Sequence, residues 1–154
     1  MATLSVGDRA PEFSLPDQSG ATVTLSELLR TGPVVLFFYP IASSGGCTQE
    51  ACHFRDLASE FAAHDAHRIG ISTDSVDKQK KFDDGNALGY PLVSDESGEV
   101  ASAYGVKRGL LGKLAPVKRK TFVIGTDGTI KAVIGSETKM AVHADDALKA
   151  LAAA

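Results

Sequence analysis

The pattern of apolar and polar residues along the chain predicts strands that alternate with helices. Residues 34–39 are apolar at every position, which is typical of a strand buried on both faces of a sheet, and Pro40 ends this run. Residues 68–73 read as a second buried strand. Between the two strands, the apolar residues follow helical spacing at Cys47, Ala51, Phe54, Ala58 and Phe61. A strand, a helix and a second strand are therefore expected here.

Turn signals place hairpins on either side of this pattern. Residues 13–25 alternate around a turn-forming segment, and Asp127-Gly128 marks a second hairpin within residues 121–134. A final helix is expected over residues 143–151. The whole pattern predicts an α/β fold with a mixed central sheet, helices on both faces and an N-terminal β-hairpin. By analogy, this order of elements is thioredoxin-like.

Length and composition exclude several classes of protein. The chain has 154 residues, of which 44% are hydrophobic and 23% charged, as in an ordinary globular protein. We expect a single domain over residues 3–152. The net charge of −3 gives no reason to expect a nucleic-acid partner. The longest apolar run is far shorter than the ~20 residues of a membrane-spanning helix, and no secretory signal is visible, so we expect a cytoplasmic protein.

Cys47 and Cys52 are the two cysteines of the chain. Cys47 follows a strand and a glycine-rich loop, and it stands in the first turn of the predicted helix. Unpaired backbone N–H groups at a helix start favour an anion, so this position would stabilise a thiolate. A buried cysteine is also common as an inert apolar residue. Position alone leaves both interpretations open.

The spacing of Cys52 from Cys47 favours redox chemistry. In an intact helix, a residue five positions on lies about 140° around the axis and about 7.5 Å along it. The two Cα atoms would then be roughly 8–9 Å apart, beyond the ~7 Å that a disulfide tolerates. A permanent disulfide is therefore not expected, whereas a bond that forms only when the first turn unwinds remains feasible.

Three other chemistries fit these residues less well. A zinc site could combine the cysteines with His64 or His67, but structural zinc sites usually have a closer pair and a second matched pair. Gly45-Gly46 before a helix could cradle a phosphate, but the rest of such a motif is missing. The chain also lacks the Cys-x-x-Cys motif of a thioredoxin-type reductase.

A longer motif surrounds the cysteines. Pro40, Ser44 and Cys47 match Pro-x-x-x-Thr/Ser-x-x-Cys, and Cys52 follows five residues later. With these residues the chain resembles the peroxiredoxins, most closely the peroxiredoxin Q or bacterioferritin comigratory protein subfamily. The resemblance extends over nearly the whole chain, through residues 7–13, 71–74, 90–95, 104–106 and 119–124.

The resemblance implies a thiol-dependent peroxidase with a thioredoxin-like fold and no cofactor. Cys47 would attack hydrogen peroxide or an organic hydroperoxide as a thiolate and become a sulfenic acid. Cys52 would resolve this acid as an intramolecular disulfide, the atypical 2-Cys mechanism. Thioredoxin or a similar dithiol would then reduce the disulfide by exchange. Peroxide and thioredoxin are thus the implied partners, with no nucleic acid and no membrane, in a monomer or weak homodimer.

The resemblance also implies roles for residues around Cys47. Arg119 would stabilise the thiolate and polarise the peroxide, and Ser44 would hydrogen-bond the peroxide oxygens. Pro40 would shield the sulfur from water, and backbone N–H groups near Gly46 and Cys47 would stabilise charge on the oxygens. Two further residues are expected to support the loop and Arg119, namely Glu50 and Arg55. His53 and His143 are expected to be a solvated histidine and a helix-start residue.

Two positions depart from the usual subfamily pattern. Ser44 replaces a threonine and so lacks the β-branch that stiffens a side chain, and Gly45 replaces a proline. We expect a functional but less preorganised, slower site. Gly109, Gly112 and the leucines nearby predict a mobile loop with an apolar face. A rival hypothesis is a redox-sensing or holdase-like interaction protein with little turnover.

Overall fold

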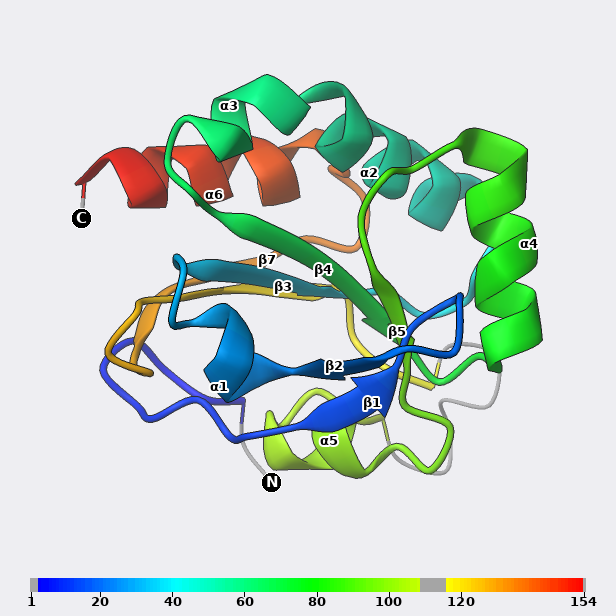
Figure 1. The fold of residues 1–154 in the computed structure, drawn as a ribbon, viewed down its shortest axis with the longest axis horizontal. Coiled ribbons are helices and arrows are strands. Elements are labelled where there is room, and N and C mark those ends of the chain that lie inside the picture. Colours follow the sequence, from blue (N-terminus) through cyan, green and yellow to red (C-terminus); the bar gives the residue numbers. More distant parts are fainter. Residues whose placement is uncertain (1–2, 109–115, 154) are drawn as a thin grey trace.

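The computed structural model describes residues 3–108 and 116–153 (Figure 1). Its central sheet has five strands in the order β5-β4-β3-β6-β7. β3, β4 and β5 are parallel, β6 runs antiparallel to β3, and β7 runs antiparallel to β6. The mixed sheet predicted from the sequence is thereby confirmed. Its strands are β3 (Val34–Phe38), β4 (His67–Ser72), β5 (Leu92–Ser94), β6 (Lys120–Ile124) and β7 (Ile130–Gly135).

β3 is the central strand, and all of its residues are buried. Its side chains alternate between two hydrophobic cores, because successive strand residues point to opposite faces. Val34, Leu36 and Phe38 belong to one core. Val35 and Phe37 belong to the other, together with Tyr39 just beyond the strand. This two-sided burial is the reason for the uninterrupted apolar run in the sequence.

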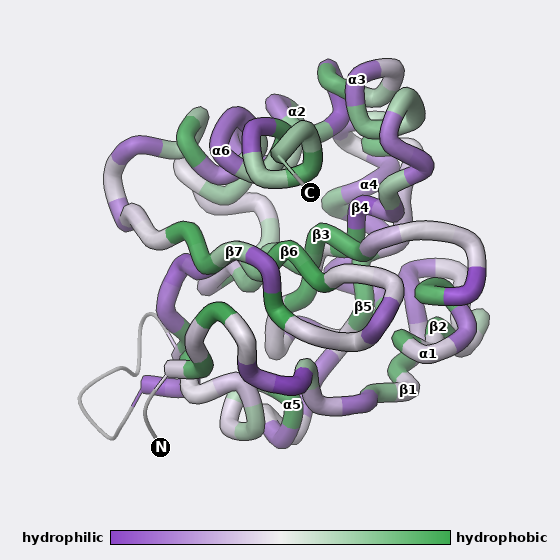
Figure 2. Tube along the Cα trace, turned by 90° about the vertical axis from the view of Figure 1, so that its left-hand side faces the viewer, coloured by the Kyte–Doolittle hydropathy of each residue, from purple (hydrophilic) through white to green (hydrophobic). Residues whose placement is uncertain are grey.

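Helices cover both faces of the sheet, as the sequence pattern predicted (Figures 1 and 2). One face carries α2 (Gly45–Asp56), α3 (Ala58–Ala62), α4 (Val76–Asn86) and α6 (Ala141–Ala153). The other face carries α1 (Leu25–Leu28), α5 (Glu99–Ala103) and the hairpin of β1 (Ser14–Pro16) and β2 (Thr22–Thr24). Figure 2 shows the hydrophobic residues concentrated in the strands between these two layers.

The helical stripe expected from Cys47 to Phe61 is interrupted, and that part of the prediction is wrong. α2 ends at Leu57, whose φ of −98° and ψ of 23° leave the helical region, and α3 begins at Ala58. Arg68 of β4 donates a hydrogen bond of 2.9 Å to the carbonyl of Phe54, which satisfies an acceptor in the last turn of α2. The break turns Ala58 to the exposed surface while Phe54 and Phe61 stay buried.

The register of the sheet determines which segments meet at the start of α2. Phe38 at the end of β3 pairs with Lys120 at the start of β6, because the two strands are antiparallel. Lys120 also pairs with Gly135 at the end of β7, so the chain that leads into α6 reaches the same edge of the sheet. The chain that follows β3, the start of β6 and the chain that follows β7 therefore converge at this edge.

The predicted loop around residues 109–114 lies outside the described residues. Within the described part of the chain, no helix is long and apolar enough to cross a membrane.

Candidate active site

Cys47 is the third residue of α2, and its side chain is buried. Ser44 caps the helix, because its hydroxyl accepts a hydrogen bond of 3.4 Å from the backbone N–H of Cys47. Ser43 before it has a φ of 67°, a left-handed conformation that is uncommon for residues other than glycine. The sulfur therefore lies at the positive end of a capped helix, where backbone N–H groups favour a negative charge.

The loop that leads into α2 is fastened to the neighbouring strand. Pro40 is buried directly after β3, and Ala42 donates its backbone N–H to Asp74 Oδ2 at 2.7 Å. Ser72, the last residue of β4, donates to the same carboxylate oxygen at 2.8 Å. The end of β4 thus holds the loop that positions Ser44 and Cys47.

Arg119 joins the sulfur of Cys47 to a buried carboxylate. Its Nη1 donates to Cys47 Sγ at 3.4 Å and to Glu50 Oε1 at 2.8 Å. Its backbone N–H donates to Glu137 Oε2 at 2.8 Å, which fixes the strand end that carries it. Burial opposes the charge of the guanidinium, but Glu50 and Cys47 outweigh burial and raise the pKa of Arg119. A permanent cation therefore stands beside the sulfur, within the protein interior.

Glu50 lies one helical turn after Cys47 and is fully buried. Burial raises the pKa of its carboxyl from 4.5 to about 8, although Arg119 opposes this shift. Among the described residues, its Oε2 atom has no hydrogen-bond partner, and it lies 3.4 Å from Nδ1 of His143. Glu50 therefore carries a carboxyl whose protonation is finely balanced at neutral pH.

Gly46 permits the close approach of Arg119 to the helix start. A Cβ atom built at Gly46 would lie 2.9 Å from Met140 Cε and 3.2 Å from Arg119 Nη2. A Cβ atom at the preceding Gly45 would meet nothing within 4 Å. The second glycine of the pair is thus needed for space, whereas the first is not.

Cys52 faces a different part of the molecule from Cys47. Its thiol donates a weak hydrogen bond of 3.6 Å to Asn86 Oδ1 on α4, and neither cysteine is part of a disulfide. Arg55 donates to the carbonyl of Asn86 at 2.7 Å and to Asp56 Oδ1 at 2.9 Å, so its contacts are with α4 and its own helix. Tyr90 donates to the carbonyl of Ala51 at 2.7 Å. These contacts hold the middle of α2 in its folded form.

Three residues of the site were not expected from the sequence. Glu137 and Met140 lie in the chain between β7 and α6, and His143, which lies in the first turn of α6 as expected of a helix-start residue, is fully buried. No local motif marks them, because the pairing of β6 with β7 brings them to Cys47. His53 bonds Asp145 Oδ1 at 2.8 Å on α6, at the protein surface.

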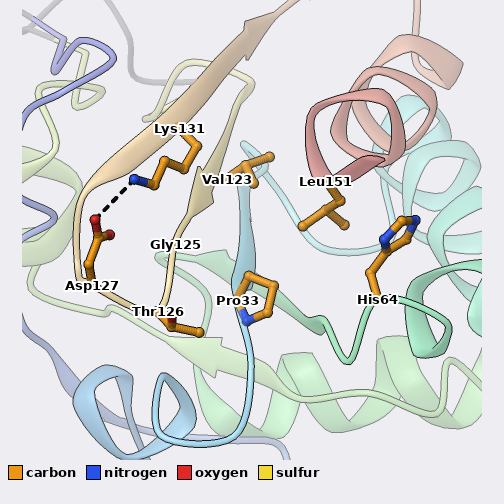
Figure 3. Close-up of a pocket in the computed structure, with 8 residues that line it drawn as sticks. All are labelled: Pro33, His64, Val123, Gly125, Thr126, Asp127, Lys131 and Leu151. Atoms are coloured by element: carbon orange, nitrogen blue, oxygen red, sulfur yellow. Dashed lines mark hydrogen bonds and ion pairs between the residues drawn. The ribbon is translucent and has the colours of Figure 1, made fainter. Parts of the chain in front are cut away.

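A separate cavity of about 300 Å³ lies at the opposite end of β3 (Figure 3). Pro33, which precedes β3, and the turn between β6 and β7 line it, with Leu151 of α6 and His64 on the other side. Its one ion pair, of 3.0 Å, joins Lys131 to Asp127. In the described part of the chain, no group of three or more histidine, cysteine and acidic side chains is placed to hold a metal ion.

Gly46→Ala should slow the alkylation of Cys47 by iodoacetamide, measured in the Cys52→Ser background, by about three- to tenfold. The new methyl group must displace Arg119 Nη2 or the end of Met140, and both are flexible enough for the protein to remain folded. The matched control is Gly45→Ala, where the added methyl group meets nothing. Equal alkylation rates in the two alanine variants would contradict a steric role for Gly46.

Glu50→Gln should change how the free energy of unfolding depends on pH. The native protein keeps the proton of Glu50 up to about pH 8, whereas the unfolded chain releases it near pH 4.5. This contribution to stability is full below about pH 4.5 and is lost as the pH rises toward 8.

Wild-type stability, relative to the variant, should therefore fall by on the order of 2–4 kcal/mol between about pH 5 and 8. Urea unfolding at several pH values measures this difference, with the exposed Glu60→Gln as the control. A difference that is independent of pH would show that Glu50 is ionised throughout this range.

Comparison with known proteins identifies the family. The AhpC/TSA family model matches residues 6–133. Peroxiredoxin Q of Gentiana triflora is 37% identical over 153 residues, which cover 99% of this chain and 69% of the relative. The crystal structure of peroxidoxin BcpB from Mycobacterium tuberculosis is 59% identical, with a TM-score of 0.93 and 97% of each chain covered.

The bacterioferritin comigratory protein of Xanthomonas campestris is also similar, at 30% identity and a TM-score of 0.84 over 99% of this chain and 98% of that one. These structures share the thioredoxin-like fold, which confirms the analogy drawn from the order of elements. The chain belongs to the AhpC/TSA family, the thiol-dependent peroxidases known as peroxiredoxins.

Proposed function

We propose that this protein reduces hydrogen peroxide and organic hydroperoxides, with Cys47 as the peroxidatic cysteine. The observation that carries this proposal is the hydrogen bond of 3.4 Å from Arg119 Nη1 to Cys47 Sγ, within a buried site at a helix start. A guanidinium and the helix N-terminus both stabilise a thiolate, which is the reactive form of cysteine. The related Xanthomonas campestris protein is described as having alkyl peroxide reduction activity, which supports the organic substrates.

In the proposed reaction, the Cys47 thiolate attacks the terminal oxygen of the peroxide. The S–O bond forms as the O–O bond breaks, and the leaving oxygen takes a proton and departs as water or an alcohol. Cys47 is oxidised to a sulfenic acid, and the peroxide is reduced. Arg119 would stabilise the negative charge that passes from sulfur to the leaving oxygen.

Ser44 is able to cap the helix and bind the peroxide at the same time. Its oxygen accepts the hydrogen bond from the N–H of Cys47, and a hydroxyl can accept and donate simultaneously. Its proton therefore remains available for a peroxide oxygen. Pro40, buried beside the loop, would keep water from the sulfur.

Resolution by Cys52 is proposed to require local unwinding of α2. Cys47 contacts Arg119, whereas Cys52 contacts Asn86 of α4, so the two thiols face different elements in the folded helix. When the first turns of α2 unwind, Cys52 can attack the sulfenic acid, which forms the disulfide and releases water. A dithiol such as thioredoxin would then reduce this disulfide by exchange. We propose that a single domain of residues 3–152 carries out this cycle. The cytoplasmic location expected from the sequence stays a prediction.

Steady-state turnover tests the proposal. With peroxide, thioredoxin, thioredoxin reductase and NADPH, the wild-type protein should consume NADPH, and Cys47→Ser should abolish that consumption. Cys52→Ser should still form a sulfenic acid once per molecule, which dimedone labelling and mass spectrometry detect, but should not cycle with thioredoxin.

The same assay separates an enzyme from a redox-sensing or holdase-like protein. Negligible NADPH consumption by the wild type, despite oxidation of Cys47, would favour the sensor. Normal cycling by Cys52→Ser would show that Cys52 is not the resolving cysteine.

The double variant Ser44→Thr with Gly45→Pro should react faster with peroxide than the wild type. Gly45 is the first residue of α2, a position that suits proline, and Ser44 already has the extended conformation that a following proline requires (φ −69°, ψ 157°). Restricting the free loop by roughly 0.4–1 kcal/mol corresponds to about a two- to fivefold higher rate. Stopped-flow mixing with peroxide measures it, and an unchanged rate would argue against preorganisation as the missing factor.

A further inference from the structure

A buried histidine lies behind Glu50, and the proposed peroxidase cycle leaves it without a role. His143 is on α6 and is fully buried. Its Nε2 lies 2.8 Å from the carbonyl oxygen of Ser136, and its Nδ1 lies 2.7 Å from Thr121 Oγ1. The same Nδ1 lies 3.4 Å from Glu50 Oε2. Through Glu50, the histidine is connected to Arg119 and hence to Cys47.

The partners of His143 determine where its hydrogens can be. A carbonyl oxygen can only accept, so Nε2 carries a hydrogen and donates it to Ser136. If the ring is neutral, Nδ1 has only a lone pair, which accepts from the hydroxyl of Thr121. If Glu50 were ionised, its buried Oε2, which no donor contacts, would then face that lone pair.

Such an arrangement is costly, because Oε2 loses its hydration and gains no hydrogen bond in return, although Oε1 is paired with Arg119. One additional proton removes the conflict. On Nδ1 it makes an imidazolium that faces the Glu50 carboxylate, and on Oε2 it makes a carboxylic acid that faces the Nδ1 lone pair. The two positions are separated by a proton transfer over a single short contact.

We propose that Glu50 and His143 hold one proton in common, and that His143 is a positioning residue that keeps Arg119 on Cys47. The proposal rests on the proposed function of Cys47. With the proton present, Glu50 and His143 together are electrically neutral, and the charge of Arg119 is left for the thiolate. Without it, Glu50 is a full anion that competes with Cys47 for the same guanidinium.

The surrounding charges are consistent with a shared proton. Glu50 faces Arg119, Glu137 and Tyr90, while His143 faces Arg119, Lys120 and Glu137. Burial raises the pKa of Glu50 to about 8 and lowers the pKa of His143, with the Ser136 carbonyl opposing the latter. Both directions leave a single proton between the two groups at neutral pH, and the contact of 3.4 Å lets either group hold it.

The proposal predicts that the rate at which Cys47 reacts decreases at alkaline pH, and this part of the pH profile is called the alkaline limb. The rate should fall at alkaline pH as the shared proton is lost, because the pKa of Glu50 is raised by burial. His143→Gln replaces a proton carrier with an amide that can hydrogen-bond Glu50 through its NH2 group but cannot take up or release a proton, which favours ionised Glu50. We expect this variant to move the alkaline limb to lower pH by about one unit and to lower the rate at pH 7.5.

Thr121→Val should move the alkaline limb in the opposite direction. It keeps the shape of the side chain but removes the hydroxyl that stabilises the neutral ring, so Nδ1 is left to Glu50 alone. The shared proton is then held more tightly, and the limb should move to higher pH. Glu50→Gln removes the ionisable group and should abolish the limb.

The experiment uses the full chain in the Cys52→Ser background, so that Cys47 is the one thiol. Single-turnover oxidation by hydrogen peroxide and alkylation by iodoacetamide are both followed by chemical quench and mass spectrometry between about pH 5.5 and 9.5. Nitrogen-15 labelling of the histidines follows the proton on His143 by NMR. His53→Gln, which removes a surface histidine bonded to Asp145, is the matched control.

The outcomes separate this proposal from the proposed function. If Cys47 is not oxidised by peroxide, the proposed function fails, while the alkylation profile and the NMR titration still report on the shared proton. If wild type is oxidised but His143→Gln gives the wild-type profile, the role of His143 is overturned. The shared proton is contradicted if two results are found together: the His143 ring stays neutral at pH 6–8, and the Glu50→Gln variant keeps the alkaline limb. If His143→Gln does not fold, the pH profile of Thr121→Val decides instead. An alkaline limb that stays in place or moves to lower pH in that variant contradicts the proposal.

Discussion

The site depends on one guanidinium that is shared between a sulfur and a buried carboxylate. Arg119 donates from the same nitrogen to Cys47 and to Glu50, at 3.4 and 2.8 Å. A cation in the interior is costly unless it is paired, so Glu50 is what allows Arg119 to be buried at all. The same partner also competes with the thiolate for the cation. The protonation of Glu50 therefore bears directly on how much of this charge the sulfur receives.

The sheet brings these groups together, which is why their positions along the chain do not reveal that they are neighbours. Cys47 follows the central strand β3, and Arg119 precedes β6, the antiparallel neighbour of β3. The end of β7 lies next to the start of β6 and leads to Glu137 and His143. Side chains that are about seventy to a hundred positions away from Cys47 thus come together around it through ordinary strand pairing.

Under the proposed cycle, the helix that carries both cysteines has to meet two opposing demands. To activate Cys47, its first turn must be well formed, and the Ser44 cap and the ties to Asp74 hold it so. To let Cys52 reach Cys47, the same turns must open. The helix is short, and its end at Leu57 separates it from α3, so unwinding need not disturb the rest of that layer. Glycine at position 45 shifts this balance toward the open form, because it leaves the unwound loop more freedom.

The sequence by itself determined the elements and the position proposed to be reactive. The apolar run of β3, the two hairpins and the start of α2 follow from local periodicity and turn chemistry, and the motif around Cys47 from residue types at fixed spacing. Only the tertiary structure decided the end of α2 at Leu57, where Arg68 of β4 donates a hydrogen bond to a carbonyl in the last turn of the helix. It alone also decided the contacts of Arg119 with Glu50 and of Glu50 with His143. Local patterns are set by neighbours along the chain, whereas these contacts arise from strand register and burial, which depend on residues far apart in sequence.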